Sequence, residues 1–237
     1  MDGRLVQATP MRSAIARRMV DSKQQAPHFY VSTEVRVDAL ERLIAQVNAD
    51  DSAARVTATG ALVRAVAGAL RQQPRLNSVW TEDGLLEAAE VNVGVAIAVE
   101  GGLIAPALLA ADQLDLRGTA DGLQGLIDRA RSRRLKPAEL TDATFTLSNL
   151  GMFEVSAFTA IITPPQVGIL ATGRSLPRIV PAQDGVETAS ILTATLSADH
   201  RAVDGVDAAR FLEAFKRAVE APEQLLTTIQ PSEVTTA

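Results

Sequence analysis

The sequence contains no cysteine, which excludes disulfide bonds, a cysteine nucleophile and thiolate metal sites. Histidine occurs only twice, at His28 and His200, so a histidine-rich metal site is excluded as well. No carboxylate-rich metal signature is recognisable, and we expect no bound metal. The sequence also lacks a glycine-rich dinucleotide loop and a Walker-type phosphate loop, which leaves nucleotide cofactors without support.

Aromatic residues are scarce, at 3% of the chain, and the formal net charge is −5. No basic cluster is interleaved with aromatic residues, so we expect no nucleic-acid partner. No apolar run has the length that a membrane span needs, and the first residues lack the apolar core of a signal peptide. We therefore expect a cytoplasmic protein without a membrane partner.

Apolar residues make up 47% of the 237-residue chain, enough for a full core in one large domain or two small ones. Alternating patterns predict strands over residues 28–37, 91–99, 103–109, 144–147, 167–171, 178–180 and 191–198, with a hairpin over 78–90. Helical spacing predicts helices over 13–22, 38–48 (with Asp38 as N-cap), 58–72, 115–133 and 205–220. Strands and helices are intermingled without a repeat or a linker, which predicts one α/β domain with a mixed sheet and helices against it.

The polar stretch 197–205 is the most distinctive part of the chain, because it lies between an alternating β-branched run and a strongly helical one. The pattern places His200 at the end of a strand, just before a turn that Gly205 helps to form. A fold can display a reactive side chain at such a place. A solvated turn whose histidine caps the next helix explains the spacing equally well.

The motif Asp199-His200-Arg201-x-x-Asp204-Gly205 resembles the signature of the acyltransferase (E2) catalytic domain of 2-oxo acid dehydrogenase complexes. Its His-x-x-x-Asp-Gly core is shared with chloramphenicol acetyltransferase. Further motifs resemble the same domain in the family's order: Met11-Arg12-x-x-Ile15-Ala16-x-Arg18-Met19, Pro27-His28-Phe29, Gly102-Leu103-Ile104-Ala105-Pro106 and Thr144-Phe145-Thr146-Leu147-Ser148-Asn149-Leu150-Gly151. The resemblance runs from about Met11 to about Leu226, and it implies the chloramphenicol acetyltransferase-like fold of CoA-dependent acyltransferases.

The reaction that the resemblance implies is acyl transfer between dihydrolipoamide and coenzyme A, by direct attack without an acyl-enzyme. A thiol is mostly protonated near neutral pH, so the attack needs a general base, and His200 is the candidate. His28 is the alternative, but it follows a proline in a predicted strand, where packing or capping is the expected role. The resemblance supplies Ser148 as the donor to the oxyanion; no Gly-x-Ser-x-Gly elbow surrounds it, which argues against a nucleophilic serine.

The resemblance also implies supporting residues. In the related acetyltransferases the aspartate that matches Asp204 is structural and pairs with an arginine near the N-terminus, for which Arg12 and Arg18 are the candidates here. Asp199 is expected to play a similar structural part, or to be an exposed turn residue. The residues that contact coenzyme A are not assigned: the basic cluster at residues 129–134 fits a CoA phosphate, and it also fits a solvated helix end. The family's usual Asn-Asp at the start of one helix is replaced here by Thr59-Gly60, which puts one polar contact of the usual site in doubt.

None of the three lysines lies in the Asp-Lys-Ala context of a lipoyl domain, so the lipoyl group is expected from a separate domain or protein. The resemblance implies a homotrimer, with a larger cage left open, and E1 and E3 components as indirect partners. We expect an N-terminal arm or linker end over residues 1–12, the catalytic domain over 13–226 and a polar tail over 227–237. Such a tail is ill suited to the apolar contacts that join trimers into cages.

Two other interpretations stay open at this level. The chain could be a stand-alone acyltransferase of the same fold that uses coenzyme A thioesters with another acceptor. It could also be a mainly structural core paralogue. The sequence does not distinguish acetyl, succinyl and branched-chain acyl groups.

Overall fold

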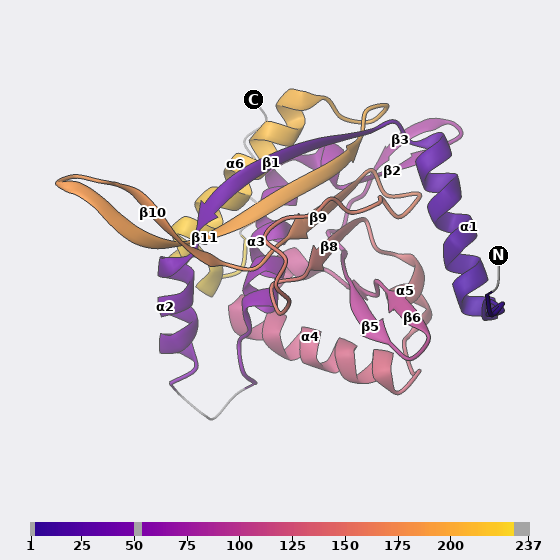
Figure 1. The fold of residues 1–237 in the computed structure, drawn as a ribbon, viewed down its shortest axis with the longest axis horizontal. Helices are drawn as coiled ribbons and strands as arrows, with labels where there is room; N and C mark the ends of the chain where they lie inside the picture. Colours follow the sequence, from indigo (N-terminus) through magenta and orange to yellow (C-terminus); the bar gives the residue numbers. More distant parts are fainter. Residues whose placement is uncertain (1–2, 50–53, 230–237) are drawn as a thin grey trace.

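A mixed seven-stranded sheet forms the centre of the computed structural model, which describes residues 3–49 and 54–229 (Figure 1). Its strand order is β1 (His28–Arg36), β11 (Gly185–Asp199), β9 (Gly168–Thr172), β8 (Phe145–Asn149), β4 (Val93–Val95) and β7 (Ala107–Leu108), and β10 (Leu176–Ala182) also pairs with β11. Strand β8 runs parallel to both of its neighbours, and the other pairs are antiparallel.

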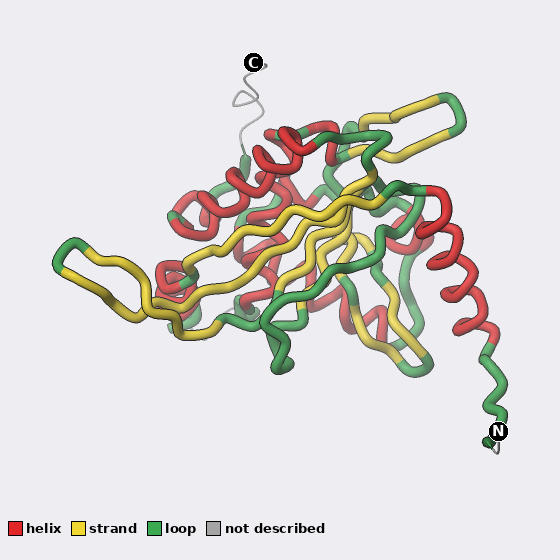
Figure 2. The backbone as a smooth tube through the Cα atoms, turned by 45° about the horizontal axis from the view of Figure 1, so that its top comes forward, coloured by secondary structure: helices red, strands yellow, loops and turns green. Residues whose placement is uncertain are grey.

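Strand β11 is long enough to serve two pairings. Its first half forms a hairpin with β10, and the hairpin projects from the body of the molecule in both ribbon views (Figures 1 and 2). Its second half pairs with β1 on one side and β9 on the other. Two small ribbons, β2 (Ser78–Thr81) with β3 (Gly84–Glu87) and β5 (Ile97–Val99) with β6 (Gly102–Ile104), lie outside the main sheet.

Helices cover one face of the sheet. Helix α3 (Ala58–Gln72) contacts α4 (Leu116–Arg131) and α6 (Gly205–Glu220), and α2 (Asp38–Val47) packs beside them. The short helices are α5 (Pro137–Thr141) and the 3₁₀ turns η1 (Pro74–Leu76), η2 (Ala111–Gln113) and η3 (Pro222–Leu226). Helix α1 (Pro10–Gln25) stands at one edge of the molecule (Figure 1). No helix in the described part of the chain is long and apolar enough to span a membrane.

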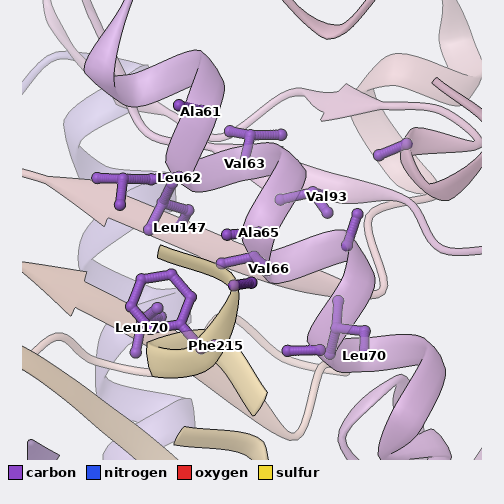
Figure 3. Close-up of a cluster of buried hydrophobic side chains, with 14 of the residues drawn as sticks. Ala61, Leu62, Val63, Ala65, Val66, Leu70, Val93, Leu147, Leu170 and Phe215 are labelled. Atoms are coloured by element: carbon purple, nitrogen blue, oxygen red, sulfur yellow. The ribbon is translucent and has the colours of Figure 1, made fainter. Parts of the chain in front are cut away.

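The core lies between the sheet and this helical layer. Helix α3 is buried along most of its length, because small and branched apolar residues occupy nearly every position. Its Leu62, Val66 and Leu70 belong to the same cluster as Leu147 of β8 and Phe215 of α6 (Figure 3). A helix that is apolar all round must be enclosed on all sides. Helix α3 is therefore the fixed element against which the sheet is positioned.

The α/β class and the mixed sheet flanked by helices are confirmed, and several element bounds are corrected. The first helix begins at Pro10, three residues before the predicted start, with Thr9 as its N-cap. Asp38 is not an N-cap: it is the first residue of α2, and its carboxylate accepts the backbone N–H of Ser190 on β11.

The two strands predicted over 91–99 and 103–109 are each divided in the structure. Strand β4 ends at Val95, and the chain then leaves the main sheet to form the β5–β6 ribbon. Pro106 has no N–H to donate to a ladder, which separates β6 from β7. The prediction of strands in both regions is confirmed, but their continuity is wrong, and β4 and β7 are buried on both faces instead of alternating. Of the predicted tail, residues 230–237 lie outside the described part, and Thr227 is held by its carbonyl, which accepts from Arg64 at 2.6 Å.

We predict that Gly173→Ala destabilises the fold. Gly173 follows β9, and a Cβ there would overlap the carbonyl oxygen of Ser156 and lie 2.8 Å from that of Val155. Such overpacking costs about 1–3 kcal/mol of unfolding free energy. Gly205→Ala is the matched control, because nothing lies within 4 Å of a Cβ at the start of α6. Chemical denaturation measures both, and equal stability of the two variants would contradict the packing account.

Candidate active site

His200 lies in the turn that follows β11, and its side chain is exposed in the single chain. Two residues of the segment entering β1 hold it: the Pro27 carbonyl accepts the His200 N–H at 3.0 Å, and the Phe29 ring packs on the imidazole with centroids 4.5 Å apart. Within the described residues, neither ring nitrogen of His200 has a hydrogen-bond partner. The imidazole is thus positioned by packing and open to a proton donor.

The turn itself is built on an ion pair whose carboxylate is buried. Asp199, which is 1% exposed, accepts three hydrogen bonds from the Arg201 guanidinium, the shortest at 2.6 Å. Its carboxylate also accepts the Arg201 N–H at 3.0 Å, and the guanidinium lies over the Trp80 ring. The hydrogen bond to Asp199 raises the pKa of Arg201. Asp199 is therefore a buried structural residue and not an exposed turn residue, and its partner lies two residues further along the chain.

Asp204 does not form the predicted pair with Arg12 or Arg18, so that prediction is wrong within the chain. Its carboxylate caps α6, accepting from Val206 N at 2.9 Å and Asp207 N at 3.2 Å. These backbone amides, that of Asp207 first, hold the pKa of the Asp204 carboxyl below its ordinary value. Both amides bind Oδ1, so the carboxylate is oriented by the start of α6 and lies exposed at that helix end.

The two arginines lie elsewhere. Arg12 is exposed in the first turn of α1, where its N–H donates to Thr9, and the Arg18 guanidinium donates to the Pro164 carbonyl at 2.5 Å. Ser22, one turn further along α1, donates to the Ile162 carbonyl at 2.6 Å. Helix α1 thus holds the segment that precedes β9.

His28 belongs to the same arrangement and is structural. The Ile162 N–H donates to its Nε2 at 3.1 Å, so the ring proton is on Nδ1, which donates to the Ala26 carbonyl at 2.8 Å. Both nitrogens are occupied, which removes His28 as a general base and leaves His200. Nothing in the sequence pattern identified this contact.

Ser148 lies near the end of β8 and is half-buried. Side chains alternate along a strand. Leu147 and its buried neighbours face the helices, so Ser148 points to the opposite face of the sheet. Within the described residues its hydroxyl makes no side-chain hydrogen bond, which leaves it free to donate.

Strand register places Ser148 far from His200 in the same chain. Ser148 pairs with Ala171 of β9, and Ala171 pairs with Thr195 of β11. Two strand spacings separate Ser148 from Thr195 by about 10 Å, and five residues of β11 carry the chain about 16 Å further to His200. The two Cα positions are thus about 19 Å apart, too far for the side chains to act on one reacting carbonyl within a single chain.

Asn149 is a residue of this region that sequence reasoning missed. Its Nδ2 donates to Thr59 on α3 at 3.0 Å, and its Oδ1 accepts the Gly151 N–H at 2.8 Å. The Asn-x-Gly spacing after Ser148 was the available signal. Thr59 was noted in the sequence only as a departure from the family pattern.

Two arginines of the basic cluster at the C-terminal end of α4 form ion pairs within the chain. The Arg129 guanidinium binds the buried carboxylate of Glu139 at 2.6 Å, and Arg133 pairs with exposed Glu100 at 3.1 Å. No group of three or more potential metal-ligating side chains occurs within the described ranges.

The comparison with protein families gives one match over nearly the whole chain. The family model described as 2-oxoacid dehydrogenases acyltransferase (catalytic domain) matches residues 2–227. A similar curated protein is the dihydrolipoyllysine-residue acetyltransferase component of the pyruvate dehydrogenase complex of Rickettsia bellii, 40% identical over 226 residues. The match covers 94% of this chain and 54% of that protein, so the chain spans about half the length of this relative.

Solved structures of the same kind are close in fold. A probable dihydrolipoamide acetyltransferase of Listeria monocytogenes is 32% identical, with a TM-score of 0.89 over 96% of this chain and 99% of that one. A dihydrolipoamide acetyltransferase of Azotobacter vinelandii, studied for the roles of a serine, a histidine and an asparagine in its mechanism, has a TM-score of 0.90 at 27% identity over 95% of each chain. The cubic core of a pyruvate dehydrogenase complex gives 0.90 at 26% identity, with the same coverage.

A chloramphenicol acetyltransferase, at 14% identity and a TM-score of 0.55, covers 89% of this chain and 94% of that one. At that identity the likeness concerns the fold alone. It confirms the expected chloramphenicol acetyltransferase-like architecture.

We predict that Asp204→Ala lowers the melting temperature by a few degrees at neutral pH, because α6 loses its N-cap. Asp204→Asn, which keeps a capping oxygen, is the control and loses less. The pKa of the Asp204 carboxyl is lower in the folded state than in the unfolded state. Its negative charge therefore stabilises the fold above the unfolded-state pKa, and this stabilisation disappears as the pH falls through the folded-state pKa. The gap between wild type and Asp204→Ala therefore narrows below about pH 4. Thermal melts across that range that show a constant gap would contradict the charged cap.

Proposed function

The chain belongs to the family of 2-oxoacid dehydrogenase acyltransferase catalytic domains, and we propose on that basis that it transfers an acyl group between dihydrolipoamide and coenzyme A. The relatives reported above are acetyltransferases, which supports an acetyl group as the one transferred. The observation that carries the proposal is the exposed imidazole of His200, held in position with both ring nitrogens available.

In the proposed reaction His200 removes the proton from the attacking thiol of coenzyme A. The sulfur then bonds to the carbonyl carbon of the acyl-dihydrolipoamide thioester. The carbonyl oxygen becomes an oxyanion, the bond to the lipoyl sulfur breaks, and the proton passes from the imidazolium to that leaving sulfur. No bond to the protein forms at any stage. The contact with Phe29 keeps the ring at the place where this proton moves.

Ser148 is the proposed donor to the oxyanion. A hydroxyl aimed at the developing charge contributes about 3–4 kcal/mol to lowering the barrier in comparable acyl transfers. Ser148 offers such a hydroxyl on the face of the sheet opposite the helical core. The proposed roles of His200 and Ser148 are consistent with the histidine and serine studied in the Azotobacter vinelandii relative.

We further propose that the site is completed by two chains. The separation of about 19 Å within one chain leaves each chain with half of the machinery. A closed ring of head-to-tail contacts joins the His200 end of one sheet to the Ser148 end of the next, and a homotrimer is the smallest ring that the resemblance supports. The proposal leaves open whether such rings assemble into larger cages, as in the cubic core relative.

The partners follow from the substrate. The lipoyl group is supplied by a separate lipoyl domain or protein, and the E1 and E3 components act on that group before and after this transfer. A reduced dithiol substrate suits a cytoplasmic location, where thiols are kept reduced. The domain division at residues 13 and 226 also remains part of the proposal.

The direct test is transfer of acetyl from acetyl-CoA to free dihydrolipoamide. We predict that His200→Ala abolishes it with an unchanged melting temperature, because an exposed turn residue contributes little to stability. Ser148→Ala is expected to lower kcat by about 10²–10³ with little change in KM, since the interaction forms chiefly in the transition state. Retention of more than a few per cent of activity in His200→Ala would remove His200 as the base.

The shared site is tested by complementation. We predict that His200→Ala and Ser148→Ala chains, denatured together and refolded in equal amounts, recover activity that neither parent has. Random mixing pairs an intact His200 with an intact Ser148 at about a quarter of the interfaces, so about a quarter of wild-type activity is expected. Refolded parents alone are the control. No activity above theirs would mean that each chain builds a complete site.

A further inference from the structure

We propose that Thr59 is a positioning residue for Ser148 and acts through Asn149. The inference rests on the function proposed above, because it assigns Thr59 a part in placing the oxyanion donor. Thr59 lies on α3, and Ser148 and Asn149 lie at the end of β8. The chain has Thr59-Gly60 where the family resemblance leads to Asn-Asp.

Strand alternation separates the two faces on which Ser148 and Asn149 act. Leu147 packs in the core beneath α3, and the residue two positions later points the same way. Asn149 therefore reaches α3, where its Nδ2 donates to the Thr59 hydroxyl at 3.0 Å. Ser148, between them, points to the opposite face. The hydrogen bond from Asn149 to Thr59 thus fixes the end of β8 from the helical side. It leaves free the opposite face of the sheet, on which Ser148 is proposed to act.

The orientation of the Asn149 amide follows from its partners. The Gly151 N–H can only donate, so the atom it meets at 2.8 Å must be Oδ1, and Nδ2 must then meet Thr59. Rotation of the amide would place Nδ2 against the Gly151 N–H and lose that hydrogen bond. The Thr59 hydroxyl is consequently an acceptor in this contact, and a side chain without oxygen cannot replace it.

The part of α3 that carries Thr59 is rigid. Helix α3 is buried over most of its length, and Thr57 caps its first turn by accepting the Gly60 N–H at 3.1 Å. Gly60 lies against α4, where an added Cβ would be 3.9 Å from the Ala120 backbone. The hydroxyl of Thr59 is therefore presented at a fixed point of the helical layer.

The turn that follows Ser148 and Asn149 is closely packed. The Leu150 N–H donates to the Thr172 carbonyl at 2.9 Å, and a Cβ on Gly151 would lie 2.9 Å from Asn149 Oδ1 and 3.3 Å from the Gly173 carbonyl. With the turn closed on one side and Thr59 on the other, the direction of the Ser148 side chain is determined. A small misplacement of a donor is costly in catalysis, up to about 10²-fold for a shift of 1 Å.

The experiment is a double-mutant cycle. Thr59→Val removes the acceptor at constant shape, and Thr59→Ser keeps it. Each change is made in wild type and in Ser148→Ala, and kcat and KM for acetyl transfer are measured with the melting temperature. We expect Thr59→Val to lower kcat about tenfold with KM unchanged, and Thr59→Ser to recover most of that loss. In Ser148→Ala, Thr59→Val is expected to cost less than about twofold, because the residue it positions is already gone.

The outcomes separate this inference from the proposed function. A tenfold loss of kcat from Thr59→Val in both backgrounds would overturn the positioning role, since the effects would then be independent. An unchanged kcat in wild type would overturn it as well. If Thr59→Val does not fold, Thr59→Ala supplies the same cycle. Absence of acetyl transfer by the wild-type protein would instead overturn the proposed function itself.

Discussion

The register of β8, β9 and β11 is the constraint on which the rest of this account depends. Because β9 pairs with both neighbours through Ala171, Ser148 lies level with Thr195, while β11 continues five residues further to His200. A sheet is rigid over such distances, since each step is fixed by backbone hydrogen bonds. The proposed base and the proposed donor therefore lie at opposite ends of the sheet in each chain. Only a second chain can bring a base and a donor together.

Each end of the sheet has its own local support. At the His200 end, the ion pair of buried Asp199 with Arg201 shapes the turn, and Phe29 orients the ring. At the Ser148 end, Asn149 is held between α3 and the following turn. The supports use buried side chains or contacts on the helical side of the sheet. The reactive groups stay exposed or half-buried, as a site built between subunits requires.

The sequence predicted the long, strongly patterned elements well. Helices α3 and α6 were predicted to the residue, because their apolar spacing and flanking residues agree. The predicted pair of Asp204 with Arg12 or Arg18 does not form within the chain. Asp204 caps α6, whereas both arginines lie on α1, where Arg12 is exposed and Arg18 donates to the Pro164 carbonyl. The contacts of His28 and Asn149 join residues 134 and 90 positions apart, and a single sequence carries no signal of such pairs.

The shared site can be tested most directly by cross-linking, because the chain has no cysteine of its own. The double variant Ser148→Cys, His200→Cys carries two unique thiols, and a bifunctional thiol reagent much shorter than about 19 Å cannot join them within one chain. The account predicts that the reagent produces covalently joined chains on a denaturing gel, while each single variant stays monomeric. Linkage confined to single chains, located by peptide mapping, would contradict it.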